Sequence, residues 1–199
     1  MKKIIFAVVV AMLFAVTVRA EIIEDFAKIK GISDSVCVGA TSNEEKVIAL
    51  SHYVYMKLKP DASKGIEPFA QLSTTDRLES GVGWCNHQIA VFMRLAEQQH
   101  IKTRMLYLTD SAGESSPHTI GEAWIGGRWV IIDPMFDQVL RNEKGELASL
   151  RDVYKNKDIL KTVPLIQARL EENYHGDEAE FENWIDNYLN PVIFVYGLE

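Results

Sequence analysis

Residues 118–134 read HTIGEAWIGGRWVIIDP, two runs of strand-forming residues separated by Gly126 and Gly127. A Gly-Gly pair readily takes the positive φ angles of a two-residue turn, so this stretch predicts a β-hairpin. With the two glycines as its loop, Ile125 faces Arg128, and alternate residues along each strand share a face. The pattern of residues therefore predicts one register for the hairpin.

This register decides which polar side chains of the hairpin can meet. His118 and Asp133 fall on one face as diagonal neighbours, about 7–8 Å apart at the backbone, so the carboxylate can hydrogen-bond the imidazole. A slip of one residue would place them on opposite faces. Glu122 shares the face and is a rival partner for the histidine, but we rank it below Asp133 and expect it to have a structural role.

Residues 81–98 read GVGWCNHQIAVFMRLAEQ, a glycine-punctuated turn followed by apolar residues at helical spacing. The pattern predicts a helix up to about Gln98, with Cys85 at or near its N-terminus. Free N–H groups at a helix start and an adjacent imidazolium both stabilise a thiolate, lowering the pKa of a cysteine by several units. Cys85 is therefore the candidate nucleophile of an acyl-transfer reaction, with His118 moving the proton and Asp133 orienting the ring.

The rest of the chain predicts helices towards both ends and strands in the middle. We expect helices over about 43–59, near 148–156 and near 177–189, a strand over 103–109 and a polar loop over 111–117. On the helix over 43–59, His52 is expected to be an ordinary surface or core residue. No internal repeat or linker divides the chain, so residues 21–199 are interpreted as a single domain.

The first twenty residues have the pattern of a secretory signal peptide. Lys2 and Lys3 precede 15 uncharged residues, 4–18, and the segment ends in small residues at Val18 and Ala20. The pattern predicts cleavage after Ala20 and a secreted or periplasmic protein. The alternative is an uncleaved membrane anchor, but a helix needs about 20 apolar residues to span a bilayer, so no stable membrane insertion is expected after cleavage.

Composition places the chain among ordinary globular proteins. Of 199 residues, 47% are hydrophobic and 25% charged, which excludes intrinsically disordered and low-complexity classes. The formal net charge is −7, and Lys and Arg form no cluster beyond the first residues. A nucleic-acid backbone binder needs concentrated positive charge, so nucleic acid is not an expected partner.

Cys37 and Cys85 leave two alternatives open. An oxidising compartment favours their pairing in a disulfide, which would remove the nucleophile; otherwise one thiol is structural and the other reactive. Two cysteines without a C-x-x-C motif provide no zinc framework, and no calcium-loop pattern is present. We therefore expect neither a metal nor a cofactor.

Taken together, these segments resemble the transglutaminase-like superfamily. The resemblance rests on Gly83-Trp84-Cys85 leading into a helix, on His118, and on Gly127-Arg128-Trp129 running to Asp133-Pro134, in that order along about residues 43–137. It implies an α+β, papain-like core in which a helix carrying the cysteine packs on an antiparallel sheet carrying the histidine and the aspartate. Residues 138–199 would form a helical extension.

The resemblance also implies the roles of the site residues. Cys85 would be the nucleophile, His118 the general base and acid, and Asp133 its orienter, forming a catalytic triad. The backbone N–H of Cys85 is a candidate oxyanion donor, and Gln71 or Trp84 could add a side-chain donor. The chain departs from the family where members often have Trp two residues after the histidine, because it has Ile120 there.

The sequence thus predicts an exported cysteine-dependent enzyme that acts on amide or peptide bonds through a thioester. Its partner would be a protein or peptide substrate. Hydrolysis and transamidation share every step up to the thioester, and the lean towards hydrolysis comes from the resemblance to peptidase-like bacterial members alone. The alternative is an inactive binding or structural module with the same fold.

Overall fold

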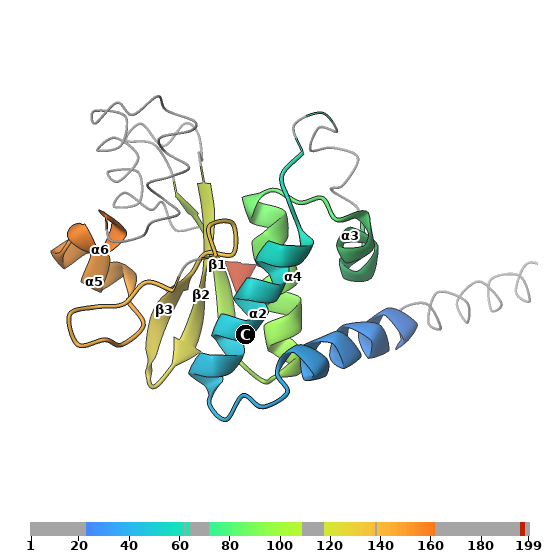
Figure 1. The fold of residues 1–199 in the computed structure, drawn as a ribbon, viewed down its shortest axis with the longest axis horizontal. Coiled ribbons are helices and arrows are strands. Elements are labelled where there is room, and N and C mark those ends of the chain that lie inside the picture. Colours follow the sequence, from blue (N-terminus) through green and yellow to red (C-terminus); the bar gives the residue numbers. More distant parts are fainter. Residues whose placement is uncertain are drawn as a thin grey trace, which may run out of the picture.

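In the computed structural model of the chain, the described residues are 23–61, 63, 72–108, 118–137, 139–161 and 196–197. They form an antiparallel sheet with helices on both sides, α2 and α4 on one side and α5 and α6 on the other (Figure 1). The helices are residues 23–36, α2 (Asn43–Lys57), α3 (Thr74–Ser80), α4 (Cys85–Gln98), α5 (Leu150–Lys155) and α6 (Asp158–Lys161). The strands are β1 (Thr103–Leu108), β2 (His118–Ile125), β3 (Arg128–Ile132) and β4 (Tyr196–Gly197). The expected α+β class, with the helix that carries Cys85 packed on an antiparallel sheet, is confirmed.

The sheet has the order β3-β2-β1-β4, and its β2–β3 hairpin has the expected register. Ile125 pairs with Arg128, and the pairing continues to Gly121 opposite Ile132. Gly126 and Gly127 have φ angles of 57° and 85°, as a two-residue turn with two positive φ angles requires. The sequence-based register is therefore confirmed.

The helix α2 is fixed at both ends by its sequence. Ser42 caps its N-terminus and forms a capping box with Glu45. The helix ends at Lys57, two residues before the expected end at 59, because Lys59 precedes Pro60, a position that disfavours helix, and pairs with Val82 in a parallel bridge. This bridge matters for the site because it anchors the turn that leads into α4.

The helix over residues 23–36, α3 and α6 were not predicted. Of these, α3 leads into the turn before Cys85. Its signals are local and short: the Ser73 side chain accepts a hydrogen bond from the N–H of Asp76, and Gly81 ends the helix with a φ of 69°. Seven residues between a loop and a glycine-rich turn provide too few apolar positions to show a helical period.

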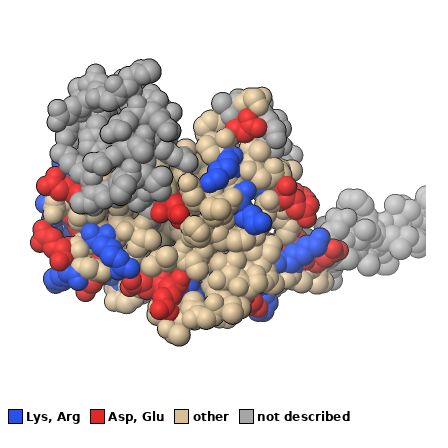
Figure 2. Space-filling model, viewed as in Figure 1, with Lys and Arg blue, Asp and Glu red and all other residues tan. Residues whose placement is uncertain are grey.

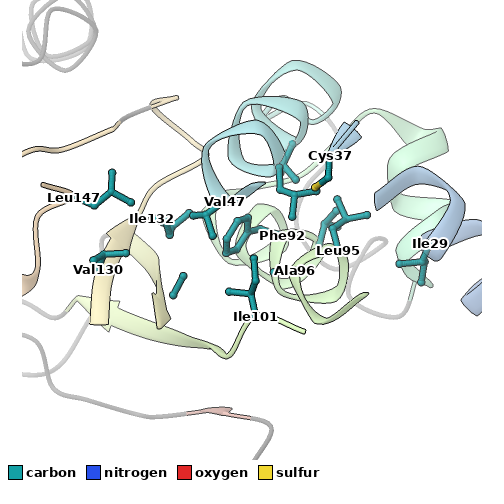
Figure 3. Close-up of a cluster of buried hydrophobic side chains, with 14 of the residues drawn as sticks. Ile29, Cys37, Val47, Phe92, Leu95, Ala96, Ile101, Val130, Ile132 and Leu147 are labelled. Carbon is teal, nitrogen blue, oxygen red and sulfur yellow. The ribbon is translucent and has the colours of Figure 1, made fainter. Parts of the chain in front are cut away.

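Two clusters of buried apolar side chains occupy the two faces of the sheet. The cluster beneath α2 and α4 includes Val47, Leu50, Phe92, Leu95, Ala123, Val130 and Ile132 (Figure 3). The cluster towards α5 and α6 includes Leu106, Leu108, Ile120, Ile131, Val153 and Leu160. Adjacent residues of β2 and β3 enter opposite clusters, as the alternation of strand side chains requires. Burying a large apolar side chain contributes about 1.5–3 kcal/mol, so both faces hold the sheet in place.

Some elements expected from the sequence lie outside the described residues, so they cannot be compared with the structure. The helix expected near 148–156 is α5, whereas the helix near 177–189, the loop over 111–117 and the signal peptide over 1–20 lie outside the described residues. Within the described part of the chain, no helix is both long and apolar enough to cross a membrane.

Candidate active site

Cys85 is the first residue of α4, and a glycine on the sheet lets that helix approach closely. A Cβ atom at Gly121 of β2 would lie 3.3 Å from Cδ1 and 3.4 Å from Cγ2 of Ile89, tighter than an ordinary packing contact. Ile89 lies one helical turn after Cys85 on the same side of the helix. Gly121 therefore sets how near the first turn of α4 sits to β2.

The turn before Cys85 is held by hydrogen bonds from two directions. The N–H of Gly83 donates to the carbonyl of Lys59, and the N–H of Lys59 donates to the carbonyl of Gly81, both at 3.0 Å. The buried side chain of Gln88 donates from Nε2 to the carbonyl oxygens of Leu58, at 3.1 Å, and Gly83, at 3.2 Å. The backbone entering Cys85 is thereby fixed to the segment that follows α2.

His87 completes the first turn of α4. Its Nδ1 accepts the backbone N–H of Trp84, the N-cap residue, at 3.3 Å. Burial and then the charge of Arg77 lower the pKa of His87 to about 4, so the ring is neutral near pH 7 and Nδ1 can accept. The histidine that follows Cys85 by two residues thus supports the helix start.

His118 and Asp133 meet at the start of β2 and the end of β3. His118 Nε2 lies 2.8 Å from Asp133 Oδ2, and both side chains are buried. The other carboxylate oxygen of Asp133 accepts the backbone N–H of Met135 at 3.2 Å, and the ring of Phe136 packs edge-on against His118 with 5.3 Å between centroids. Both the imidazole and the carboxylate are held from more than one side.

Cys85 interacts with the imidazole of His118 through a hydrogen bond and through charge. Burial alone would raise the pKa of Cys85, but a hydrogen bond and the charge of His118, followed by hydrogen bonds with Thr119, outweigh it and lower the pKa below the ordinary thiol value. Burial lowers the pKa of His118, while the charge and hydrogen bond of Asp133, and then Cys85, raise it to about 10. The arrangement favours a thiolate beside an imidazolium.

The structure thus brings together the three side chains expected at the site, Cys85, His118 and Asp133. Glu122, the rival partner, pairs instead with Arg104 on the neighbouring strand, and the Arg104 guanidinium lies 4.3 Å from the centre of the Trp129 ring. Burial raises the pKa of Glu122, and the hydrogen bond and charge of Arg104 oppose that rise.

Both cysteines are free thiols, so the alternative of a disulfide between them is not realised. Cys37 is buried in the apolar cluster beneath α2 and α4 (Figure 3). Burial is the main cause that raises its pKa, in contrast to Cys85. The pKa values of the two thiols are therefore shifted in opposite directions, upward for Cys37 and downward for Cys85.

Sequence reasoning missed two contributors to the site, Gln88 and Thr119. Gln88 cannot be recognised from a sequence motif, because it donates to the backbone carbonyls of Leu58 and Gly83, which any residue type would provide. Thr119 contacts Cys85 through strand placement alone. His52 is an exposed surface residue, as expected, and its Nδ1 lies 2.8 Å from Asp137 Oδ2, a contact across 85 positions of sequence that joins α2 to the loop after Asp133.

Of the two side chains expected as oxyanion donors, the structure describes Trp84 but not Gln71. The indole Nε1 of Trp84 is buried and has no hydrogen-bond partner among the described residues, whereas Gln71 lies outside them. In the part of the chain that the structure describes, no group of three or more His, Cys, Asp or Glu side chains could hold a metal ion.

Comparison with known proteins gives one family match. A family model described as the transglutaminase-like superfamily matches residues 30–134, more than half of the chain. Among curated proteins, none matches.

Two solved structures are similar to the chain. One, described as a candidate cysteine protease from Cytophaga hutchinsonii, is 20% identical, with 66% of this chain and 44% of that one covered and a TM-score of 0.48. The other, described as a candidate protease from Parabacteroides distasonis ATCC 8503, is 10% identical, with 54% and 23% covered and a TM-score of 0.46. The chain therefore spans less than half the length of either.

Proposed function

The chain belongs to the transglutaminase-like superfamily, and we propose that it is a cysteine-dependent acyl-transfer enzyme acting on amide or peptide bonds. One observation carries the proposal: the buried ring of His118 bonds to Asp133 and lowers the pKa of Cys85. A thiol with a lowered pKa, beside a proton carrier held by a carboxylate, is the arrangement that nucleophilic acyl transfer requires.

In the first half-reaction, the Cys85 thiolate attacks the carbonyl carbon of the substrate and the carbonyl oxygen becomes an oxyanion. The backbone N–H of Cys85, at the start of α4, is a candidate donor to that oxygen, and the unpartnered indole N–H of Trp84 is a second. His118 then gives its proton to the leaving nitrogen, the C–N bond breaks, and a thioester remains on Cys85.

In the second half-reaction, an acceptor attacks the thioester carbonyl and His118 takes its proton. Water releases a carboxylic acid, and an amine forms a new amide; in both cases the C–S bond breaks and the thiolate returns. We propose hydrolysis as the main outcome, as the resemblance to peptidase-like bacterial members suggests.

The experiment is to incubate the purified protein with a peptide mixture and a labelled primary amine, and to analyse the products and the intact protein by mass spectrometry. Cleaved peptides and an acylated Cys85 are expected, and label in the products would assign transamidation instead. The matched control is Cys37→Ser, which removes the other thiol and should leave acylation unchanged. No acylation by peptides or by an activated ester, with Cys85 reduced, would mean that the chain is the inactive module.

We also propose that the protein is exported and that the working enzyme is residues 21–199, a single transglutaminase-like domain. The support is the sequence of residues 1–20, with its basic start, apolar run and small residues before the cleavage position. N-terminal sequencing of the protein from a secreting host should begin at Glu21. A mature product that begins at Met1 would overturn the proposal.

A further inference from the structure

The backbone N–H groups at the start of α4 lack the acceptor that a helix usually finds in its N-cap residue. The first four N–H groups of a helix have no carbonyl partner within it. In α4 they belong to Trp84, Cys85, Asn86 and His87. Trp84, the N-cap residue, cannot bind one of them as Ser or Asp would, because its indole has a donor and no acceptor. Any acceptor for these groups must therefore come from elsewhere.

Two side chains of the first turn supply acceptors to two of the four groups. The Nδ1 atom of His87 accepts the N–H of Trp84 at 3.3 Å, and Oδ1 of Asn86 accepts the N–H of His87 at 2.9 Å. The N–H groups of Cys85 and Asn86 have no hydrogen-bond partner among the residues that the structure describes. Two adjacent donors, one of them on the nucleophile itself, thus remain for a ligand.

The bond to His87 also fixes the backbone that enters Cys85. Both polar groups of the Gly83–Trp84 peptide are held, the N–H by His87 and the carbonyl by Nε2 of Gln88 at 3.2 Å. The next peptide joins the carbonyl of Trp84 to the N–H of Cys85, and this carbonyl accepts the N–H of Gln88 at 2.9 Å. Because a peptide group is planar, a fixed carbonyl also fixes the direction of the N–H beside it. The first turn of α4 therefore sets the direction of the Cys85 N–H.

The surroundings of His87 keep its ring close to the N-cap and able to accept. The residue is only 7% exposed, and with burial and the charge of Arg77 lowering its pKa to about 4, the ring is neutral near pH 7. A neutral ring that accepts at Nδ1 carries its proton on Nε2. A Cβ atom at Gly83 would lie 3.3 Å from Cβ of His87 and 3.3 Å from Cδ1 of Leu58, so glycine permits this close packing.

From this arrangement we propose that His87 is a positioning residue of the acyl-transfer reaction. By binding the N–H of Trp84, it holds the N–H groups of Cys85 and Asn86 in place for the oxyanion of the substrate. The inference rests on the proposed acyl-transfer function and adds a residue that acts through the backbone of Trp84. Its effect is confined to steps in which negative charge develops on a carbonyl oxygen. Alkylation by iodoacetamide, in which an S–C bond replaces a C–I bond, forms no oxyanion.

The test compares His87→Leu with His87→Asn, because Leu removes the acceptor whereas Asn keeps an acceptor atom at the same branch of the side chain. With an activated peptide ester as the substrate, His87→Leu should lower kcat roughly tenfold at nearly constant KM, less than the 10²–10³-fold loss of an oxyanion donor removed outright. The rate of Cys85 alkylation by iodoacetamide should stay at the wild-type value. His87→Asn should recover most of the lost kcat.

The matched control is Arg94→Leu, because Arg94 is exposed on the same helix and pairs at the surface with Glu97. That variant should have the kcat and the alkylation rate of the wild type. The free energy of unfolding of each variant is measured by chemical denaturation. If His87→Leu does not fold, His87→Phe takes its place, since it keeps a ring but has no acceptor.

Two results would overturn the inference while the acyl-transfer function stands. One is a folded acceptor-free variant with wild-type kcat, whatever its free energy of unfolding, because His87 would then only support the helix. The other is an alkylation rate that falls in the same proportion as kcat, because the defect would then lie in the thiol and not at the oxyanion. If no substrate acylates reduced Cys85 in the wild type, the acyl-transfer function itself fails, and the positioning role with it.

Discussion

His118 at the beginning of β2 and Asp133 just after the end of β3 are joined by a hydrogen bond of 2.8 Å between Nε2 and Oδ2. The bond closes the open end of the hairpin, at the opposite end from the Gly126-Gly127 turn. Because the carboxylate holds one ring nitrogen, the imidazole has a fixed tautomer and orientation, and its other nitrogen is available for exchange with the Cys85 sulfur.

Asp133→Asn should leave the fold intact and reduce acylation by up to about 10⁴-fold, because an amide at this position favours the wrong tautomer of His118. The rate is measured as acylation of Cys85 by an activated peptide ester, followed by intact-protein mass. Asp137→Asn, in the same loop but bonded to His52, is the control and should cost far less. Equal rates in Asp133→Asn and the wild type would show that the carboxylate does not orient the ring.

The pH dependence follows from the two shifted groups. As pH falls through the lowered pKa of Cys85, the thiolate is protonated and both alkylation and turnover decline. As pH rises towards about 10, His118 loses the proton that the leaving nitrogen needs, so turnover of amides declines while alkylation by iodoacetamide continues. In His118→Ala, the alkylation midpoint should move up towards the ordinary thiol value of about 8.5.

These profiles are recorded on the same preparations, with iodoacetamide for the thiolate and a peptide amide for turnover. An alkylation midpoint that is the same in His118→Ala and the wild type would contradict the thiolate–imidazolium pair.

Gly121→Ala should destabilise the protein by about 1–3 kcal/mol, because the new methyl group overpacks Ile89 on α4. It should also slow acylation, since the displaced helix carries Cys85. Chemical denaturation gives the free energy of unfolding. Gly31→Ala is a suitable control: its Cβ meets nothing within 4 Å and the residue lies in a helix, so the exchange should be neutral or stabilising by about 0.5–1 kcal/mol.

Gln88→Met keeps the length of the side chain but removes its donors to Leu58 and Gly83. Leaving buried carbonyls without a partner costs about 1–3 kcal/mol, and the turn before Cys85 should loosen. We expect a lower unfolding free energy together with a reduced kcat at nearly constant KM. Gln98→Met, at the end of the same helix and half-buried, should have little effect on stability. If the free energy of unfolding falls as expected but kcat is unchanged, Gln88 has a structural role only.

Lys and Arg side chains form no continuous patch on the face in Figure 2, where they alternate with Asp and Glu. This agrees with the scattered charges of the sequence. The proposed acyl-transfer reaction does not depend on a strongly charged surface.

Local features of this protein follow from its sequence alone. The glycine pair specifies the hairpin register, because a two-residue turn allows only one alignment of its strands, and this register places His118 and Asp133 on one face. The helical period and the glycine-rich turn place Cys85 at the start of α4. These predictions need only the period of a strand, the period of a helix and the chemistry of a turn.

Tertiary packing sets what local patterns do not encode. The approach of α4 to β2 depends on Gly121 facing Ile89, and the partner of Glu122 proves to be Arg104 on the other neighbouring strand. The contact of His52 with Asp137, and a cleft between α4 and the helix over residues 23–36, join segments far apart in sequence. Such contacts depend on how whole elements dock, because docking is set by the summed burial of many side chains rather than by the spacing of a few.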